Sequence, residues 1–173
     1  MYDHTIEGLP YEHEKFHYFK IGLGASPNPA IPQLKTLGQM MTENGHMGSY
    51  GMILKIDIEG AEWDVIAEID QELLTHFSQI VFEFHNLIFP KYEERIKTAM
   101  EKLNKTHQLV HLHPNNYGGY LQIGGKVLSE LIEGTYLLRS EYLFTQEPLT
   151  FPTPQDEINS IYLPDIYLGS WDT

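Results

Sequence analysis

Acidic side chains end the most clearly strand-like run of this chain. Residues 52–58 are apolar and rich in β-branched side chains, and they lead through Asp57 and Glu59 to a glycine, Gly60. In open parallel α/β sheets, ligands bind at the carboxyl ends of the strands. Asp57 is therefore a candidate site residue. Glu62, in the acidic turn that follows, has two interpretations, because it could cap a helix beginning there or belong to the site.

A second apolar run repeats this pattern. Residues 79–86 end in Glu83, His85 and Asn86. If the two runs are neighbouring parallel strands, these side chains share one crevice with Asp57. A carboxylate and an imidazole in a partly desolvated cleft can act as a general base. Alternatively, Asp57, Glu83 and Asn86 could hold a divalent cation through their oxygens. The sequence leaves both interpretations open.

Two further histidines, His111 and His113, suggest a different kind of metal site. They are two positions apart in the strand-like run 108–113, so they point to the same face. Together with the carboxylates described above, they would form the centre of a metal-dependent hydrolase. The alternative is that both are hydrogen-bonded residues of the core.

The composition limits the classes of partner. The 173 residues include 24 Asp and Glu but only 11 Lys and Arg, giving a formal net charge of -13. Such a surface repels a phosphate backbone, so nucleic acid is not an expected partner. There is no cysteine, which excludes disulfides and thiolate zinc sites. No apolar run approaches the roughly 20 residues that span a bilayer, so a soluble, cytoplasmic protein is expected.

Hydrophobic periodicity predicts strands that alternate with helices. The expected strands are 16–21, 52–58, 79–85, 108–113 and 134–144, and the expected helices are 33–43, 61–76 and 92–103. This alternation predicts a single α/β domain over residues 1–173 with a mostly parallel sheet. The one glycine-rich candidate for a cofactor loop is GLGAS at 22–26. A short Gly-x-Gly is a weak signal, and a plain turn is the alternative.

The segment around the first acidic strand end resembles the signature of the FkbM-type methyltransferases. It reads LKIDIEGAEW over residues 54–63. Three other segments are similar to a related branch of methyltransferases: EFH at 83–85, HLHPNN at 111–116 and LPDI at 163–166. FkbM-type enzymes are class I methyltransferases that depend on S-adenosylmethionine. The resemblance covers most of the chain, from Asp3 to about Leu168.

This resemblance implies a fold and a cofactor residue. The class I fold is a Rossmann-like, mostly parallel sheet of seven strands in the order 3-2-1-4-5-7-6, with the seventh antiparallel. Residues 3–6 would end the second strand, so Asp3 would bind the ribose of the cofactor. The third to seventh strands would be 16–21, 52–58, 79–85, 109–113 and 136–144.

The same alignment places the first strand and its glycine-rich loop before Met1, so a truncated chain is expected. Loss of four buried apolar side chains from a central strand would cost roughly 6 to 12 kcal/mol, which is comparable with the stability of a whole domain. It would also leave two open strand edges. Another polypeptide, closure of the remaining strands or self-association would then have to complete the sheet.

The expected function is transfer of a methyl group from S-adenosylmethionine to a hydroxyl of a sugar or other small metabolite, by a product that could be inactive alone. Asp57 would anchor the site, and His85 or Glu83 would remove the hydroxyl proton. A divalent cation on Asp57, Glu83 and Asn86 could acidify the hydroxyl instead. The alternatives are a catalytically silent fragment or interaction domain, and the metal-dependent hydrolase.

Overall fold

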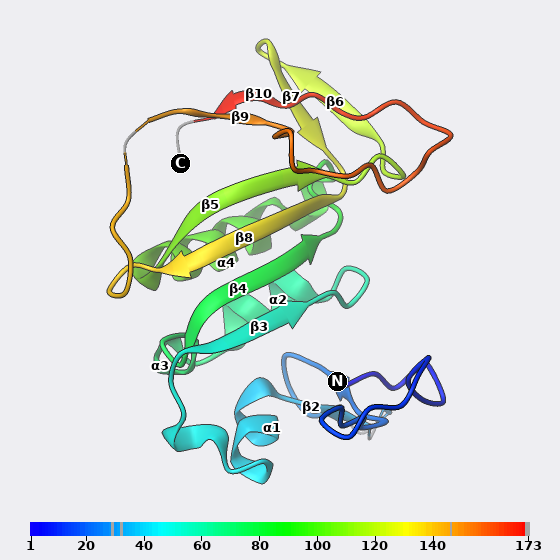
Figure 1. The fold of residues 1–173 in the computed structure, drawn as a ribbon, viewed down its shortest axis with the longest axis vertical. Helices are drawn as coiled ribbons and strands as arrows, with labels where there is room; N and C mark the ends of the chain where they lie inside the picture. The colour runs from blue at the N-terminus through cyan, green and yellow to red at the C-terminus, as the bar shows by residue number, and fades with distance from the viewer. Residues whose placement is uncertain (29, 32, 146, 172–173) are drawn as a thin grey trace.

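The computed structural model describes residues 1–28, 30–31, 33–145 and 147–171 (Figure 1). The helices are α1 (Leu37–Glu43), α2 (Glu62–Glu68), α3 (Gln71–Leu74) and α4 (Glu93–Thr106), with 3-10 turns at His46–Gly48 and Pro90–Tyr92. The strands are β1 (Gly22–Leu23), β2 (Leu34–Lys35), β3 (Met52–Ile56), β4 (Phe77–Phe84), β5 (His107–Pro114), β6 (Tyr120–Ile123), β7 (Lys126–Ser129), β8 (Ile132–Leu138), β9 (Leu149–Phe151) and β10 (Gly169–Trp171).

Four strands form the central sheet in the order β3-β4-β8-β5. β3 runs parallel to β4, and Lys55 lies opposite Val81. β8 is antiparallel to both β4 and β5. The carboxyl ends of β3, β4 and β5 therefore meet at one edge of the sheet. This edge is where the acidic side chains of the first two strands emerge.

One face of the sheet carries the core. Ile80, Phe82 and Phe84 alternate along β4 and are almost fully buried, as period-two geometry requires of one strand face. The helices α2 and α4 cover this face (Figure 1), and Trp63 of α2 stacks on Phe84 with ring centroids 4.4 Å apart. Leu103 of α4 is also fully buried in the same cluster.

Local signals explain where the helices begin. Thr36 starts α1 with a capping box, because its hydroxyl accepts from the amide of Gln39 and the Gln39 side chain accepts from the amide of Thr36. The helix expected over 61–76 is divided into α2 and α3. Asp70 adopts an extended backbone and accepts from the amide of Glu72 at 3.0 Å, so it caps a new helix instead of continuing the old one.

The prediction of a mostly parallel, Rossmann-like class I sheet is wrong. The described residues form four separate sheets of two to four strands, and in the central one β3 and β4 are the only neighbouring strands that run parallel. The expected strands at 3–6 and 16–21 do not join it, since the parallel contact there is a single bridge between Tyr2 and Phe19. The expected fourth, fifth, seventh and sixth strands do lie side by side in that order.

The antiparallel direction of β8 was already part of the expected order, so the difference lies in the connections before β3. Parallel neighbours need a crossover long enough to return the chain to the same end of the sheet, and only the helical segments between β3 and β4 and between β4 and β5 supply one. After β5 the chain forms the β6–β7 hairpin and re-enters as β8 from the opposite end. The short segments before α1 build only the two-residue β1–β2 pair.

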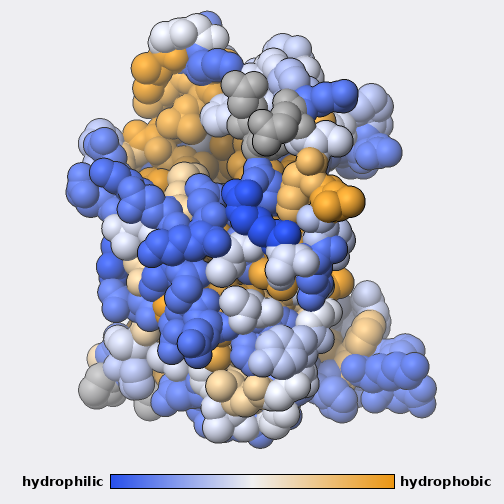
Figure 2. Space-filling view, turned by 90° about the vertical axis from the view of Figure 1, so that its left-hand side faces the viewer, coloured by the Kyte–Doolittle hydropathy of each residue, from blue (hydrophilic) through white to orange (hydrophobic). Residues whose placement is uncertain are grey.

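The C-terminal half adds two small antiparallel sheets. Gly124 and Gly125, both with positive φ, turn the chain between β6 and β7. The hairpin exposes Tyr120, Leu121 and Ile123. In Figure 2 the hydrophobic surface of the visible face gathers in the upper part of the molecule, at the level of this hairpin and of β9 and β10.

The segment that ends the chain is fixed to the sheet by a buried asparagine. The Asn116 side chain donates to the carbonyls of Ser160 and Leu163 at 2.9 and 3.0 Å, and it accepts from the amide of Ser160 at 2.7 Å. Phe151 of β9 is fully buried in a second apolar cluster with Leu112. Within the described ranges, no helix combines the length and the apolar character that crossing a membrane requires.

Candidate functional site

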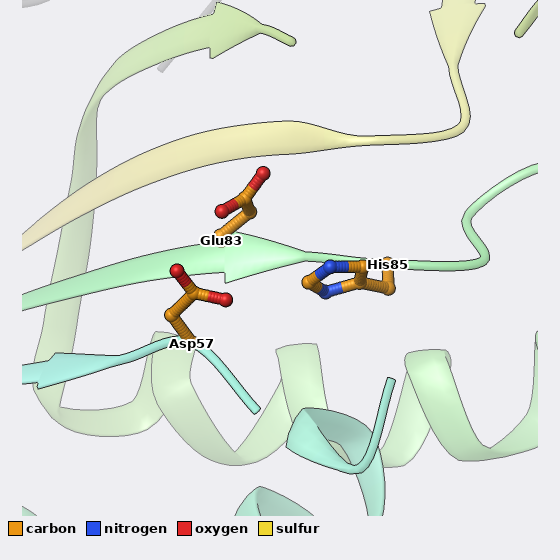
Figure 3. Close-up of side chains that lie close together, drawn as sticks. All are labelled: Asp57, Glu83 and His85. Atoms are coloured by element: carbon orange, nitrogen blue, oxygen red, sulfur yellow. The ribbon is translucent and has the colours of Figure 1, made fainter. Parts of the chain in front are cut away.

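Three of the side chains singled out in the sequence come together at the carboxyl edge of β3 and β4. Asp57 directly follows β3, Glu83 lies near the end of β4, and His85 follows its last residue. One potential ligand atom from each lies within 4.8 Å of the others (Figure 3). Asp57 is exposed, whereas Glu83 and His85 are half-buried. We call these three residues the acidic cluster.

Glu83 is the most perturbed member of the acidic cluster. Burial is the main cause that raises the pKa of its carboxyl, and the negative charge of Asp57 raises it further. The side-chain amide of Asn115 donates to Glu83 at 2.8 Å, which favours the charged form and offsets part of this rise in pKa. Glu83 is therefore a carboxylate placed where a cation or a transferable proton would stabilise it.

His85 is held by α2. The indole Nε1 of Trp63 donates to the backbone carbonyl of His85 at 2.7 Å. The imidazole Nδ1 lies 3.2 Å from the buried carboxylate of Glu62, and Nε2 lies 3.4 Å from Glu59. Nδ1 makes no hydrogen bond, although it is buried. The ring is thus placed between two carboxylates.

Glu62 has a structural role, but it does not cap α2: the N-cap residue is Ala61, and the bonds of Glu62 go to the turn before the helix. Its side chain is fully buried and folds back to accept from the amides of Ile58 at 2.9 Å and Gly60 at 3.1 and 3.2 Å. These bonds hold a turn in which Glu59 has φ 58° and Gly60 has φ 107°. The left-handed backbone at Glu59 leaves its carboxylate exposed beside His85.

A hollow of about 660 Å³ adjoins the cluster. Asp57 and Glu59 line one side of it, and Asp3 and the glycine-rich segment 22–26 line another. Asp3 accepts from the amide and the hydroxyl of Thr5, both at 2.7 Å, and chiefly the hydroxyl bond lowers the pKa of the Asp3 carboxyl. Asp3, which the family resemblance assigned to the cofactor, and the glycine-rich segment 22–26 therefore line the same hollow as Asp57.

Asn86, the third residue of the expected metal set, lies against Gly60 of the turn that precedes α2. It has a positive φ of 65°, and its side-chain amide lies over Gly60. A Cβ atom at Gly60 would be 2.6 Å from Asn86 Nδ2. A glycine is required at this position both for its positive φ and for this close approach.

The structure does not bring His111 and His113 to the acidic cluster. Both lie on β5, at the edge of the central sheet opposite β3. His111 Nε2 is 2.8 Å from Asp156, and His113 Nε2 is 3.5 Å from Asp165. These histidines contact the C-terminal segment, so the arrangement expected for a hydrolase that combines them with Asp57 is not present.

Sequence reasoning missed Asn115 as a member of the site. It follows the last residue of β5 and reaches Glu83 from the third strand that ends at this edge. The signal was available, because polar residues at the ends of the first two strands had already been singled out by the same rule.

Asp64 and Arg95, by contrast, form a surface ion pair at 2.6 Å.

Comparisons with known proteins do not assign a family. A scan of protein-family models, a search of curated proteins and a search of solved structures each give no match to the chain. The resemblance to FkbM-type methyltransferases therefore stays a prediction from the residues.

Replacement of Gly60 by Ala tests the geometry of the turn. The new Cβ would collide with Asn86 and would strain a backbone with φ 107°. We expect the free energy of unfolding to fall by about 2 to 4 kcal/mol. Gly51→Ala is the matched control, because Gly51 also has a positive φ (70°) but nothing within 4 Å. Thermal and urea unfolding measure both variants, and equal losses would contradict the close approach.

Replacement of Glu83 by Gln tests the repulsion within the cluster. Because the pKa of Glu83 is raised on folding, the native state binds more protons than the unfolded state between the ordinary and the raised pKa, so stability falls as pH rises through that window. Gln at position 83 carries no charge, so this loss of stability disappears. Its side-chain oxygen can still accept the hydrogen bond from Asn115. At neutral pH we expect a gain of up to about 1 kcal/mol, or about 2 to 4 °C in Tm.

The pH dependence is the control for this second variant. The gain in Tm should shrink as the pH is lowered below the raised pKa, because the parent protein then also carries a neutral side chain at position 83. A gain that stays constant from acidic to neutral pH, measured by thermal unfolding, would show that charge repulsion is not its cause.

Proposed function

We propose that the chain is a methyltransferase that uses S-adenosylmethionine, or the acceptor-side part of one, and that it acts on a hydroxyl group of a sugar or other small metabolite. The observation that carries this proposal is the convergence of Asp57, Glu83 and His85 at one strand edge, next to the hollow lined by Asp3 and 22–26. The volume of that hollow, about 660 Å³, is within the ordinary range for small-molecule sites.

The chemistry that the proposal requires is proton removal from a positioned hydroxyl. Methyl transfer is an in-line displacement, so a base must accept the hydroxyl proton while the oxygen is held against the methyl group. Glu83 is one candidate to accept that proton, because its raised pKa makes it a stronger base than an ordinary carboxylate. His85 is the other candidate base, and Asp57 would orient the hydroxyl from the neighbouring strand end.

A divalent cation fits the same residues. Two carboxylates and an imidazole are hard-to-borderline ligands of the kind that Mg²⁺ and Mn²⁺ accept. The repulsion between Asp57 and Glu83 favours a cation between them. When bound, such an ion lowers the pKa of a coordinated hydroxyl. Asp57, Glu83 and His85 would hold it, and Asn115 would keep the Glu83 carboxylate in place.

Titration of the whole chain with Mn²⁺ and with S-adenosylmethionine tests this function. Mn²⁺ should broaden NMR signals around the cluster, and Asp57→Asn should weaken Mn²⁺ binding at least about tenfold. The matched control is Asp64→Asn, which removes a nearby exposed carboxylate paired with Arg95. S-adenosylmethionine should bind weakly and shift the signals of Asp3 and 22–26, because one carboxylate cannot replace a cradle of backbone amides.

Each result bears on a different part of the proposal. Equal Mn²⁺ affinities for the two variants would contradict the proposed cation site on Asp57, Glu83 and His85. No shift at Asp3 or 22–26 with S-adenosylmethionine would overturn the methyltransferase assignment and favour the silent interaction domain. Sub-micromolar affinity for S-adenosylmethionine would also contradict it as stated, because a complete cofactor cradle would then be present.

The second candidate function, an interaction domain, rests on the edge of β3. Among the described residues β3 pairs on one side only, with β4, and Ile53 is 68% exposed on it. An open, apolar strand edge is a site for pairing with another chain. We therefore propose that the chain self-associates, or binds a complementing polypeptide, through this edge.

Light scattering checks the self-association. We expect a dimer or a larger species, and Ile53→Lys should shift it toward the monomer, because a lysine on a strand edge opposes pairing. Ile161→Lys is the control, since Ile161 is similarly exposed (76%) but lies in the C-terminal segment. A parent protein that is monomeric at every concentration, or an equal effect of both substitutions, would contradict association through β3.

A further inference from the structure

The N-terminal part of the chain contains a second hollow, of about 760 Å³, that the proposed function does not use. Its walls come from the first 19 residues and from the turn after α1, where Asn44 and His46 lie. It contains no member of the acidic cluster, and it shares only Tyr2 with the hollow beside that cluster. We call it the aromatic hollow.

Fixed aromatic rings form one wall of the aromatic hollow. Tyr2 and Phe19 stack with centroids 4.7 Å apart and planes 13° from parallel. The Asn44 side chain donates a hydrogen bond to the Tyr2 hydroxyl. The Tyr2 ring is therefore held by Phe19 on one face and by Asn44 at its hydroxyl. Phe16 adds a half-exposed ring to the lining. Rings that are already ordered bind a flat ligand with a small loss of conformational entropy.

The charge of this lining is opposite to that of the whole chain. The chain has a formal net charge of -13, yet no Asp or Glu of the described residues lines the aromatic hollow. Lys15 lines it and makes no ion pair among the described residues, and His17 and His46 also belong to the lining. The cationic side chain of Lys15 therefore belongs to a lining that is also aromatic.

The carboxylates nearest in the sequence do not line the aromatic hollow. Glu7 pairs with Lys20 at 2.5 Å. Glu12 and Glu14 line an adjoining hollow, which shares Leu9 and Phe16 with the aromatic hollow. The segment 7–20 thus divides its charges between two adjoining hollows, with Glu12 and Glu14 lining one and Lys15 and His17 lining the other. This separation leaves a positive, aromatic surface that complements a negatively charged ring compound.

We propose that the aromatic hollow binds a flat aromatic compound that carries a carboxylate or a phosphate. The ring would lie against Tyr2, Phe16 and Phe19, and the anionic group would contact Lys15 and the two imidazoles. Stacking and edge-to-face contacts with the ring provide most of the affinity, and the cationic groups select for the negative charge.

Calorimetric titration of the whole chain tests this inference. The probes are naphthalene-2-carboxylate and adenosine monophosphate, which represent the two sources of an aromatic anion. The comparison compounds are 2-naphthol, which keeps the ring without the charge, and cyclohexanecarboxylate, which keeps the charge without the aromatic ring. We expect at least one aromatic anion to bind, and both comparison compounds to bind at least about fivefold more weakly than it does.

Substitutions then locate the binding. Lys15→Glu should weaken binding of the aromatic anion about tenfold and leave the weak binding of 2-naphthol unchanged. Phe16→Ala should weaken both. Lys91→Glu is the charge-matched control, because Lys91 is also exposed but contacts Tyr92 before α4. Unchanged Tm values confirm that the variants fold.

Three results would overturn the inference. Absence of binding by both aromatic anions at their solubility limit would show that the hollow takes no such ligand. If cyclohexanecarboxylate bound as tightly as the aromatic anions, the rings of the hollow would not select for an aromatic ligand. Equal effects of Lys15→Glu and Lys91→Glu would show that the anion binds through the general charge of the protein. Binding of only one of the two probes supports the inference and identifies the source of the anion.

Discussion

The geometry of the candidate site depends on one buried carboxylate. The Glu62 carboxylate accepts hydrogen bonds from the backbone amides of Ile58 and Gly60, and these bonds hold the turn between β3 and α2. A buried charge is tolerated only where hydrogen bonds replace its lost hydration, and backbone amides supply them here. The same bonds fix the direction in which Asp57 leaves β3, and they place Glu59 and His85 together. The turn that Glu62 holds therefore has a structural role that does not depend on any chemistry at the site.

The acidic cluster opposes the stability that this turn provides. Asp57 and Glu83 lie close together at adjacent strand ends, and the pKa of Glu83 is raised by burial and by its neighbour. A sequence selected for stability alone would not place like charges at this edge. Local conflicts of this kind are concentrated at functional sites, where a ligand or a transferred proton relieves them. The conflict is the physical reason for regarding the cluster as a site.

Sequence patterns predicted the strands of the site better than the fold around them. The alternation in 79–85 and the apolar run at 52–58 correspond to β4 and β3, because period two is a local property of each strand. The direction and the partner of a strand are not local. The segments 3–6 and 16–21 look like strands locally, yet they make only a single bridge between Tyr2 and Phe19 and do not join the central sheet.

Contacts between distant residues were the other limit of sequence reasoning. The spacing of His111 and His113 showed that they share a face, but it could not show that Asp156 and Asp165 lie against them. The same holds for Asn115, whose partner Glu83 is on another strand. The role of Glu62 was left open for a similar reason, because a capping carboxylate and a site carboxylate look alike in sequence.

Two consecutive asparagines connect the cluster with the end of the chain. Asn115 holds Glu83, and Asn116 holds the turn at 160–163. A planar peptide fixes their Cα atoms about 3.8 Å apart, so neither can move far without the other. The conformational freedom of Glu83 is therefore set in part by a segment remote from it in sequence. Any event that detaches 160–163 from Asn116 would also loosen the amide that restrains Glu83, so the order of the C-terminal segment and the order of the cluster are coupled.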